Sequence, residues 1–139
     1  MFVMAAINTE RVMVVDDDED ILRVIQIGLE KAGFQVHAFS DPIVALQHIE
    51  QGCGECQILI SDVRMPKMNG FQLVKRIRQL RPAIKLVIMT AFEINKSEFE
   101  SVFPSTPIES VLRKPFVPSR LVAVVEKMTR SKSNAEVAG

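Results

Sequence analysis

Short apolar runs alternate with amphipathic stretches along most of this chain. Apolar runs bounded by turn residues are typical of buried strands, and apolar residues recurring every three or four positions are typical of helices. The pattern predicts strands at 11–15, 34–39, 57–61, 84–89 and 109–113, and helices at 19–32, 42–51, 70–80, 94–102 and 119–129. This alternation predicts an α/β fold, in which a parallel sheet is covered on both faces and its crossovers are right-handed.

Four of the predicted helices carry an apolar face that we expect to pack on the sheet. The first helix stops at Gly33, and the second opens on Asp41-Pro42, a cap followed by a first-turn proline. The residues expected on these faces are Ile21, Leu22, Ile25, Leu29 and Ala32, then Val44, Ala45, His48 and Ile49, then Phe71, Val74, Ile77 and Leu80, then Leu121, Val122, Val125 and Met128.

Composition limits the number of domains and the kinds of partner. A chain of 139 residues suits one domain, and 47% apolar with 24% charged residues is ordinary for a globular protein. Seventeen basic and seventeen acidic residues cancel, so no overall field favours nucleic acid or an anionic membrane. We expect a domain at 11–129, an N-terminal extension at 1–10 and a disordered tail at 130–139.

Targeting signals are weak in this chain. No apolar run approaches the roughly 20 residues of a membrane span. The apolar start, Met1 to Ile7, has no basic residues before it and is a poor signal peptide. We therefore expect a cytoplasmic protein that does not bind membranes.

Two cysteines, Cys53 and Cys56, form a Cys-Gly-Glu-Cys pair. A four-ligand zinc site would need a second pair or nearby histidines, which the sequence does not offer. Redox pairs usually open a helix after a strand, whereas this pair follows a predicted helix. We expect two loop thiols.

Polar side chains follow four of the predicted strands at the point where each strand ends. Asp16 and Asp17 follow the first strand, Asp62 the third, Thr90 the fourth and Lys114 the fifth. In an open parallel sheet these positions meet at the edge where ligands bind. Carboxylates suit Mg²⁺, and one of them can accept a phosphoryl group whose charge a metal, a lysine and a hydroxyl offset. The pattern therefore predicts a Mg²⁺-dependent phosphoryl-transfer site.

Four short motifs make the chain similar to the receiver domains of two-component response regulators. In order, they are Val-Val-Asp-Asp at 14–17, Asp-x-x-Met-Pro-x-Met-Asn-Gly at 62–70, Met-Thr-Ala at 89–91 and Lys-Pro-Phe at 114–116. The similarity covers residues 11–129. It implies the flavodoxin-like, doubly wound (βα)5 fold, a five-stranded parallel sheet with strand order 2-1-3-4-5.

The resemblance also implies a mechanism. Asp62 would accept a phosphoryl group from a phosphohistidine on a sensor histidine kinase or phosphotransfer protein, and Thr90 and Lys114 would contact that group. Lys114-Pro115 would be a cis peptide. The chain would act as a stand-alone switch, which catalyses its own phosphoryl transfer and autodephosphorylation and is not an enzyme in the turnover sense.

By the same resemblance, Mg²⁺ would be held by Asp16, Asp17, Asp62 and the backbone carbonyl of Arg64. A plainer interpretation is that the first two aspartates cap the helix that follows, since acids favour helix N-termini. We favour the metal-ligand interpretation for this pair and the capping role for Asp18, Glu19 and Asp20. His37 and His48 are expected to be surface or boundary residues rather than phosphohistidines.

The chain departs from the family pattern in three places. Val111 stands where receivers usually have Tyr or Phe, and a valine cannot signal by ring rotation. Prolines in the segment 103–107 predict a short, mobile or partner-shaped fourth-helix region. Arg64 and Phe92 occupy positions that tune dephosphorylation, and their bulk predicts a long-lived phosphorylated state.

Two other functions fit parts of the sequence. A phosphorylation-independent interaction module of receiver fold is favoured by Val111. An Mg²⁺-dependent aspartyl-nucleophile phosphatase would use Asp16 within an Asp-x-Asp motif, but that class needs a longer chain and a second acidic motif. The downstream protein partner is unknown from sequence. We expect no direct nucleic-acid binding, and a phosphorylation-dependent dimer is an open alternative.

Overall fold

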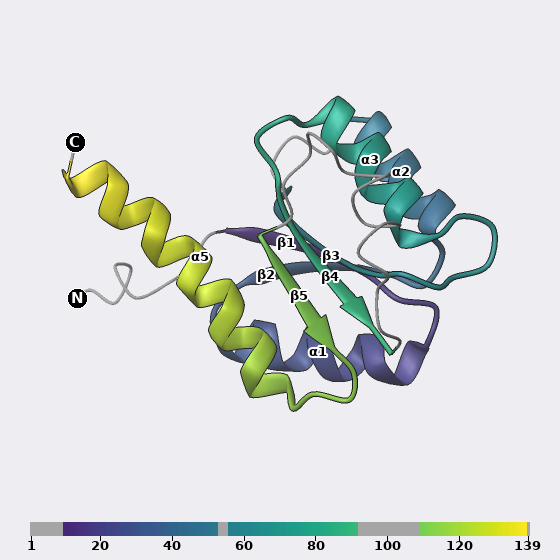
Figure 1. Cartoon of the computed structure of the whole chain (residues 1–139), viewed down its shortest axis with the longest axis horizontal. Helices are drawn as coiled ribbons and strands as arrows, with labels where there is room; N and C mark the ends of the chain where they lie inside the picture. Colours follow the sequence, from purple (N-terminus) through teal and green to yellow (C-terminus); the bar gives the residue numbers. More distant parts are fainter. Residues whose placement is uncertain (1–9, 53–55, 92–108, 139) are drawn as a thin grey trace.

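A five-stranded parallel sheet forms the centre of the molecule (Figure 1). The computed structural model describes residues 10–52, 56–91 and 109–138, with the backbone alone described for 130–138. The strands lie in the order β2-β1-β3-β4-β5, and every neighbouring pair is parallel. The predicted fold class and strand order are confirmed. The strands are β1 (Arg11–Val15), β2 (Gln35–Phe39), β3 (Cys56–Asp62), β4 (Lys85–Thr90) and β5 (Ser110–Arg113).

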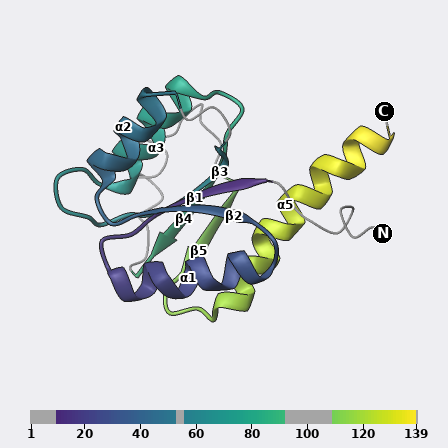
Figure 2. The same ribbon diagram turned by 180° about the vertical axis from the view of Figure 1, so that it is seen from behind.

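Helices cover both faces of this sheet. Figures 1 and 2 show α2 and α3 together on one face, and α1 and α5 on the opposite face. None of the helices within the described ranges combines the length and apolar character needed to cross a bilayer. The helices are α1 (Glu19–Lys31), α2 (Pro42–Glu50), α3 (Gly70–Leu80) and α5 (Pro118–Ala138).

The strands supply apolar side chains to both faces, because successive residues of a strand point in opposite directions. In β1, Met13 and Val15 belong to the core beneath α2 and α3, whereas Val12 and Val14 belong to the core beneath α1 and α5. All four side chains are fully buried. Each such burial contributes about 1.5–3 kcal/mol. The two cores therefore hold the strand ends, and any side chains that follow them, in fixed places.

Local sequence determines where helices begin. The Asp18 carboxylate accepts hydrogen bonds from the backbone N–H groups of Asp20 and Ile21, as the capping interpretation of this acidic run predicts. Asn69 and Gln72 form a reciprocal capping box at the start of α3. These caps satisfy N–H groups that have no partner within the helix, and each stabilises it by about 1 kcal/mol.

Some predictions of helix faces are wrong. Val44 and Leu80 are each 46% exposed, while Leu46 and Leu73, which the predicted faces omitted, are buried. The physical reason is that α2 and α3 pack against each other as well as against the sheet, so each buries two sides instead of one stripe. Cys56 is also misplaced by the sequence prediction, because it is buried as the first residue of β3 instead of lying in a loop.

The final helix is longer than predicted. α5 continues to Ala138, so the disordered tail expected after Thr129 is helical in the structure. Residues 130–138 contain no glycine or proline and several good helix formers, so nothing in their sequence stops the helix.

Several predictions lie outside the described residues and stay predictions. They are the helix at 94–102, the proline-containing segment 103–107, Phe92, Cys53 and most of the extension at 1–10. His37 and His48 are described. Both are partly buried, and their rings pack at 5.1 Å between centroids.

Candidate functional site

The polar residues singled out in the sequence lie at one edge of the sheet. Asp16 and Asp17 directly follow β1, and Asp62 is the last residue of β3. Thr90 ends β4, and Lys114 follows β5. Because all five strands run in the same direction, their carboxyl ends share this edge.

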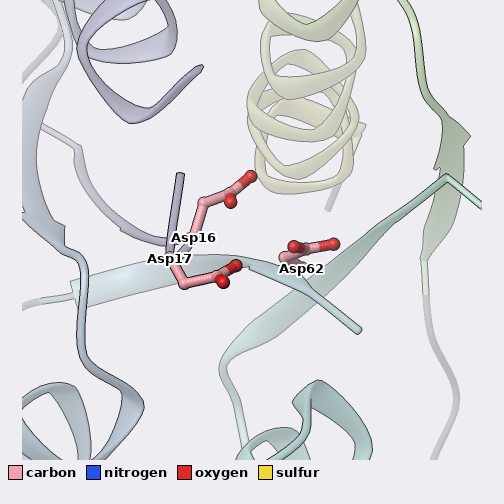
Figure 3. Close-up of side chains that lie close together, drawn as sticks. All are labelled: Asp16, Asp17 and Asp62. Atoms are coloured by element: carbon pink, nitrogen blue, oxygen red, sulfur yellow. The ribbon is translucent and has the colours of Figure 1, made fainter. Parts of the chain in front are cut away.

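Three carboxylates gather at this edge (Figure 3). Asp16, Asp17 and Asp62 each offer an oxygen, and these oxygens lie within 4.8 Å of one another. Asp16 is fully buried and Asp62 nearly so, whereas Asp17 is exposed. The cluster is therefore walled by protein on one side and open to solvent on the other.

Asp16 is held from three directions. Its backbone N–H donates to the Phe39 carbonyl at 3.1 Å, which extends the pairing of β1 with β2. Oδ1 accepts the backbone N–H of Asp18 at 2.9 Å, and Oδ2 accepts the Lys114 ammonium at 2.7 Å. Both oxygens of this buried carboxylate thus have partners, as buried charges require.

Asp62 is anchored by its own loop. Oδ1 accepts the N–H of Val63 at 2.9 Å, and Oδ2 lies 3.4 Å from Nζ of Lys114. The loop is closed by the N–H of Gly70, which donates to the Val63 carbonyl at 2.7 Å. Glycine is required at this position, since a Cβ there would clash with the carbonyl oxygen of Asp62 and lie 2.9 Å from its carbon.

Lys114 bridges the two buried carboxylates. Its backbone N–H donates to the Thr90 carbonyl at 2.7 Å, so the end of β4 positions the residue that follows β5. The Lys114-Pro115 peptide is cis, as predicted. The side chain is only 14% exposed and contacts Asp16 and Asp62 together.

Burial and charge shift the pKa of two groups in this cluster. Burial and the neighbouring Asp16 raise the pKa of Asp62 from 3.8 to about 6, against the opposing effects of Lys114 and the Val63 N–H. Burial alone would lower the pKa of Lys114, but its hydrogen bond to Asp16 and the charges of both carboxylates raise it. One ammonium group therefore offsets the negative charge of the cluster incompletely.

The cluster fits a hard divalent cation. Its donors are carboxylate oxygens, which Mg²⁺ prefers, and their spacing lets one ion contact all three. Burial is the largest cause of the raised pKa of Asp62, and repulsion by the neighbouring Asp16 carboxylate adds to it. A divalent cation would relieve this repulsion.

The remaining predicted site residues lie close by. Thr90 is buried at the end of β4, and Arg64 is exposed two residues after Asp62. Sequence reasoning missed an ion pair between Lys67, in the loop after Asp62, and Asp41, which was recognised only as a helix cap. No sequence signal joins these two residues, because their contact depends on the pairing of distant loops.

Comparisons with known proteins agree with this geometry. A family model described as the response regulator receiver domain matches residues 12–126. The chain is 31% identical over 119 residues to the response regulator receiver protein CpdR of Brucella abortus (strain 2308), covering 86% of this chain and 96% of CpdR. It is 31% identical over 113 residues to the sensor kinase CckA of the same organism, covering 81% of this chain but 12% of CckA.

Solved structures show the same fold. A CheY-like response regulator receiver domain protein from Methanospirillum hungatei JF-1 matches with a TM-score of 0.78 and 25% identity, covering 95% of this chain and all of that one. The response regulator protein TrrA from Thermotoga maritima, solved in complex with Mg²⁺-BeF, matches with a TM-score of 0.70 and 24% identity, covering 85% and 97%. The second likeness concerns the fold alone.

Proposed function

The chain belongs to the response regulator receiver domain family, and we propose that Asp62 is its phosphoacceptor. Receiver domains act in two-component signalling as switches rather than turnover enzymes, and they bind Mg²⁺ in their acidic pocket. We assign this domain to residues 11–129 and the donor to a phosphohistidine of a sensor histidine kinase or phosphotransfer protein. Phosphoryl transfer from such a phosphohistidine implies that this domain acts in the cytoplasm.

The observation that carries the proposal is the bridging position of Lys114. Its ammonium group lies 2.7 Å from one oxygen of Asp16 and 3.4 Å from one oxygen of Asp62. A phosphoryl group on Asp62 would therefore form beside a fixed positive charge. Preorganised charge of this kind stabilises the charge that develops on the transferring group.

In the transfer step, a carboxylate oxygen of Asp62 forms a bond to phosphorus. The bond from phosphorus to the donor imidazole nitrogen breaks, and its electron pair returns to that nitrogen. The acceptor must be ionised to act as a nucleophile. The pKa of Asp62, raised to about 6 by burial and by Asp16, leaves it ionised near neutral pH.

The other residues would manage charge around the phosphoryl group. Asp16, Asp17, Asp62 and the carbonyl of Arg64 would hold Mg²⁺, which when bound would neutralise charge on the phosphoryl oxygens. The hydroxyl of Thr90, on the strand next to Asp62, would donate a hydrogen bond to one of those oxygens. We also propose that the domain takes a phosphoryl group from small donors such as acetyl phosphate and later removes it by hydrolysis.

Intact-mass measurement after incubation with acetyl phosphate tests this function. We expect one phosphoryl group on the wild-type chain with Mg²⁺, and none with EDTA or on Asp62→Asn. Asp20→Asn is the matched control, because it removes an exposed aspartate of α1 outside the cluster and should label normally. Labelling of Asp62→Asn would refute the assignment, as would failure of the wild type with both acetyl phosphate and phosphoramidate.

A phosphorylation-independent interaction module remains the second candidate. The observation in its favour is Val111, which is 44% exposed on β5 where receivers usually carry an aromatic ring. If this function is correct, a downstream partner will bind the wild type and Asp62→Asn equally. The aspartyl-nucleophile phosphatase is set aside by the family assignment.

A further inference from the structure

The loop that follows Asp62 contains a strained turn at Lys67. The N–H of Met68 donates to the Pro66 carbonyl at 2.8 Å, and the residue between them, Lys67, has a φ of 72°. A hydrogen bond that spans one residue of positive φ makes a γ-turn of the rare, strained kind. Because lysine carries a Cβ, unlike glycine, this turn needs other contacts to hold it.

The Lys67 side chain makes such a contact. Its ammonium group donates to Oδ2 of Asp41 at 2.6 Å. The other oxygen of Asp41 caps α2 by accepting the N–H of Ile43 at 2.8 Å. The cap thus fixes the orientation of the carboxylate that Lys67 meets. The hydrogen bond from Lys67 is the main reason that the pKa of Asp41 lies below its usual value.

This ion pair joins two loops at the edge of the sheet that carries the acidic cluster. Asp41 follows β2 and Lys67 follows β3, so residues 26 positions apart meet. Figures 1 and 2 show the connection between β3 and α3 passing beside the start of α2.

The rest of this loop is held without Lys67. Val63 and Gly70 close its base with a 2.7 Å hydrogen bond, and Met65 and Met68 pack against the core. The ion pair therefore acts on the tip of the loop and not on the fold as a whole. Lys67, at this tip, lies three residues after Arg64 in the same loop.

We propose that the Lys67–Asp41 ion pair is a positioning contact, which holds the Arg64 carbonyl where Mg²⁺ needs it. The inference rests on the proposed function, because it assumes that this carbonyl is a metal ligand. It makes the affinity of the acidic site depend on a contact with α2. Loss of either partner would release the strained turn and cost metal affinity.

The direction in which Mg²⁺ affinity changes distinguishes a positioning role of the ion pair from a purely electrostatic effect of its charges. Removing the positive charge of Lys67 would by field alone strengthen Mg²⁺ binding, whereas removing the negative charge of Asp41 would weaken it. Positioning predicts that both changes weaken binding. Exposed ion pairs have modest energies, so we expect Mg²⁺ affinity to fall about twofold to fivefold.

The experiment measures Mg²⁺ dissociation constants by amide NMR titration, which suits a chain without tryptophan or tyrosine. The variants are Lys67→Met, Asp41→Asn and their combination, with Lys67→Arg as the conservative rescue. Asn keeps the cap acceptor of α2. A second readout is the exchange rate of the Met68 amide in EDTA, with unfolding midpoints as a control for global stability.

We expect both single variants to weaken Mg²⁺ binding and speed Met68 exchange, the double variant to be no worse than the singles, and the Arg variant to behave as wild type. Opposite changes in Mg²⁺ affinity, or no change, would overturn the proposal. Wild-type protein that binds no Mg²⁺ would refute the proposed function instead. The exchange rate of the Met68 amide is measured without metal, so it still reports whether the ion pair holds the turn in that case.

Discussion

Replacing Asp62 with asparagine should stabilise the metal-free protein while abolishing its function. The wild-type carboxylate is buried beside Asp16, and this environment raises its pKa from 3.8 to about 6. Asparagine has nearly the same shape, and its oxygen can still accept the N–H of Val63. The substitution therefore removes a penalised charge and keeps the anchoring hydrogen bond.

The magnitude follows from the two pKa values. A rise from 3.8 to about 6 corresponds to roughly 3 kcal/mol between the two protonation states. This difference already includes the opposing effect of Lys114, whose ammonium lies 3.4 Å from Asp62, and solvent screening at the open side of the cluster reduces it. We expect Asp62→Asn to raise the free energy of unfolding by about 1–3 kcal/mol near pH 7.5.

The pH dependence has a definite sign. A carboxyl whose folded pKa is raised binds its proton more tightly in the folded state, so the wild type loses stability as the pH rises from 3.8 towards 6. The advantage of asparagine should be full above about pH 6 and shrink towards zero near pH 4. Outside this window it should be constant.

Urea unfolding followed by far-ultraviolet circular dichroism in EDTA measures this difference. Asp20→Asn, which removes an exposed aspartate, is the control and should change stability by less than about 1 kcal/mol. Asp62→Asn less stable than wild type at pH 7.5, or an advantage that grows as the pH falls, would refute the reasoning.

Three further predictions test the packing and charge of the site. Gly70→Ala should destabilise the protein by about 3 kcal/mol or more in urea unfolding, because the added Cβ clashes with the Asp62 carbonyl and the loop must move. Lys114→Met should cost about 3–5 kcal/mol near pH 7.5, with Mg²⁺ restoring part of it, because Asp16 loses its buried counter-charge. Leu73→Ala should lower the free energy of unfolding by about 2–5 kcal/mol without changing the acetyl phosphate labelling of folded protein, since this fully buried side chain lies in the core.

The class of fold and the place of the acidic cluster could both be predicted from the sequence. Short apolar runs alternating with amphipathic helices specify a parallel sheet covered on both faces, and the strand order in the structure agrees with the prediction. Parallel strands bring their carboxyl ends to one edge, so aspartates placed after β1 and β3 must approach one another. Two helix caps could also be predicted, because Asp18 and Asp41 act within three residues of their own positions.

Individual helix faces were less predictable. Val44 and Leu80 are apolar and stand at helical spacing, but both are substantially exposed. Leu46 in α2 and Leu73 in α3 are buried instead, because the two helices contact each other. The apolar pattern of a single helix does not reveal such a contact. The continuation of α5 to Ala138 likewise depended on the absence of a stop residue more than on the polar character of that segment.

The electrostatic environment of Asp62 depends on contacts between distant parts of the chain. The pKa of Asp62 depends on its burial and on the distance to Asp16, and the bridging role of Lys114 depends on a contact across 98 positions of sequence. The pairing of Lys67 with Asp41 arises in the same way. The energy of a charge interaction depends on the distance between the groups and on their burial, and local sequence patterns specify neither.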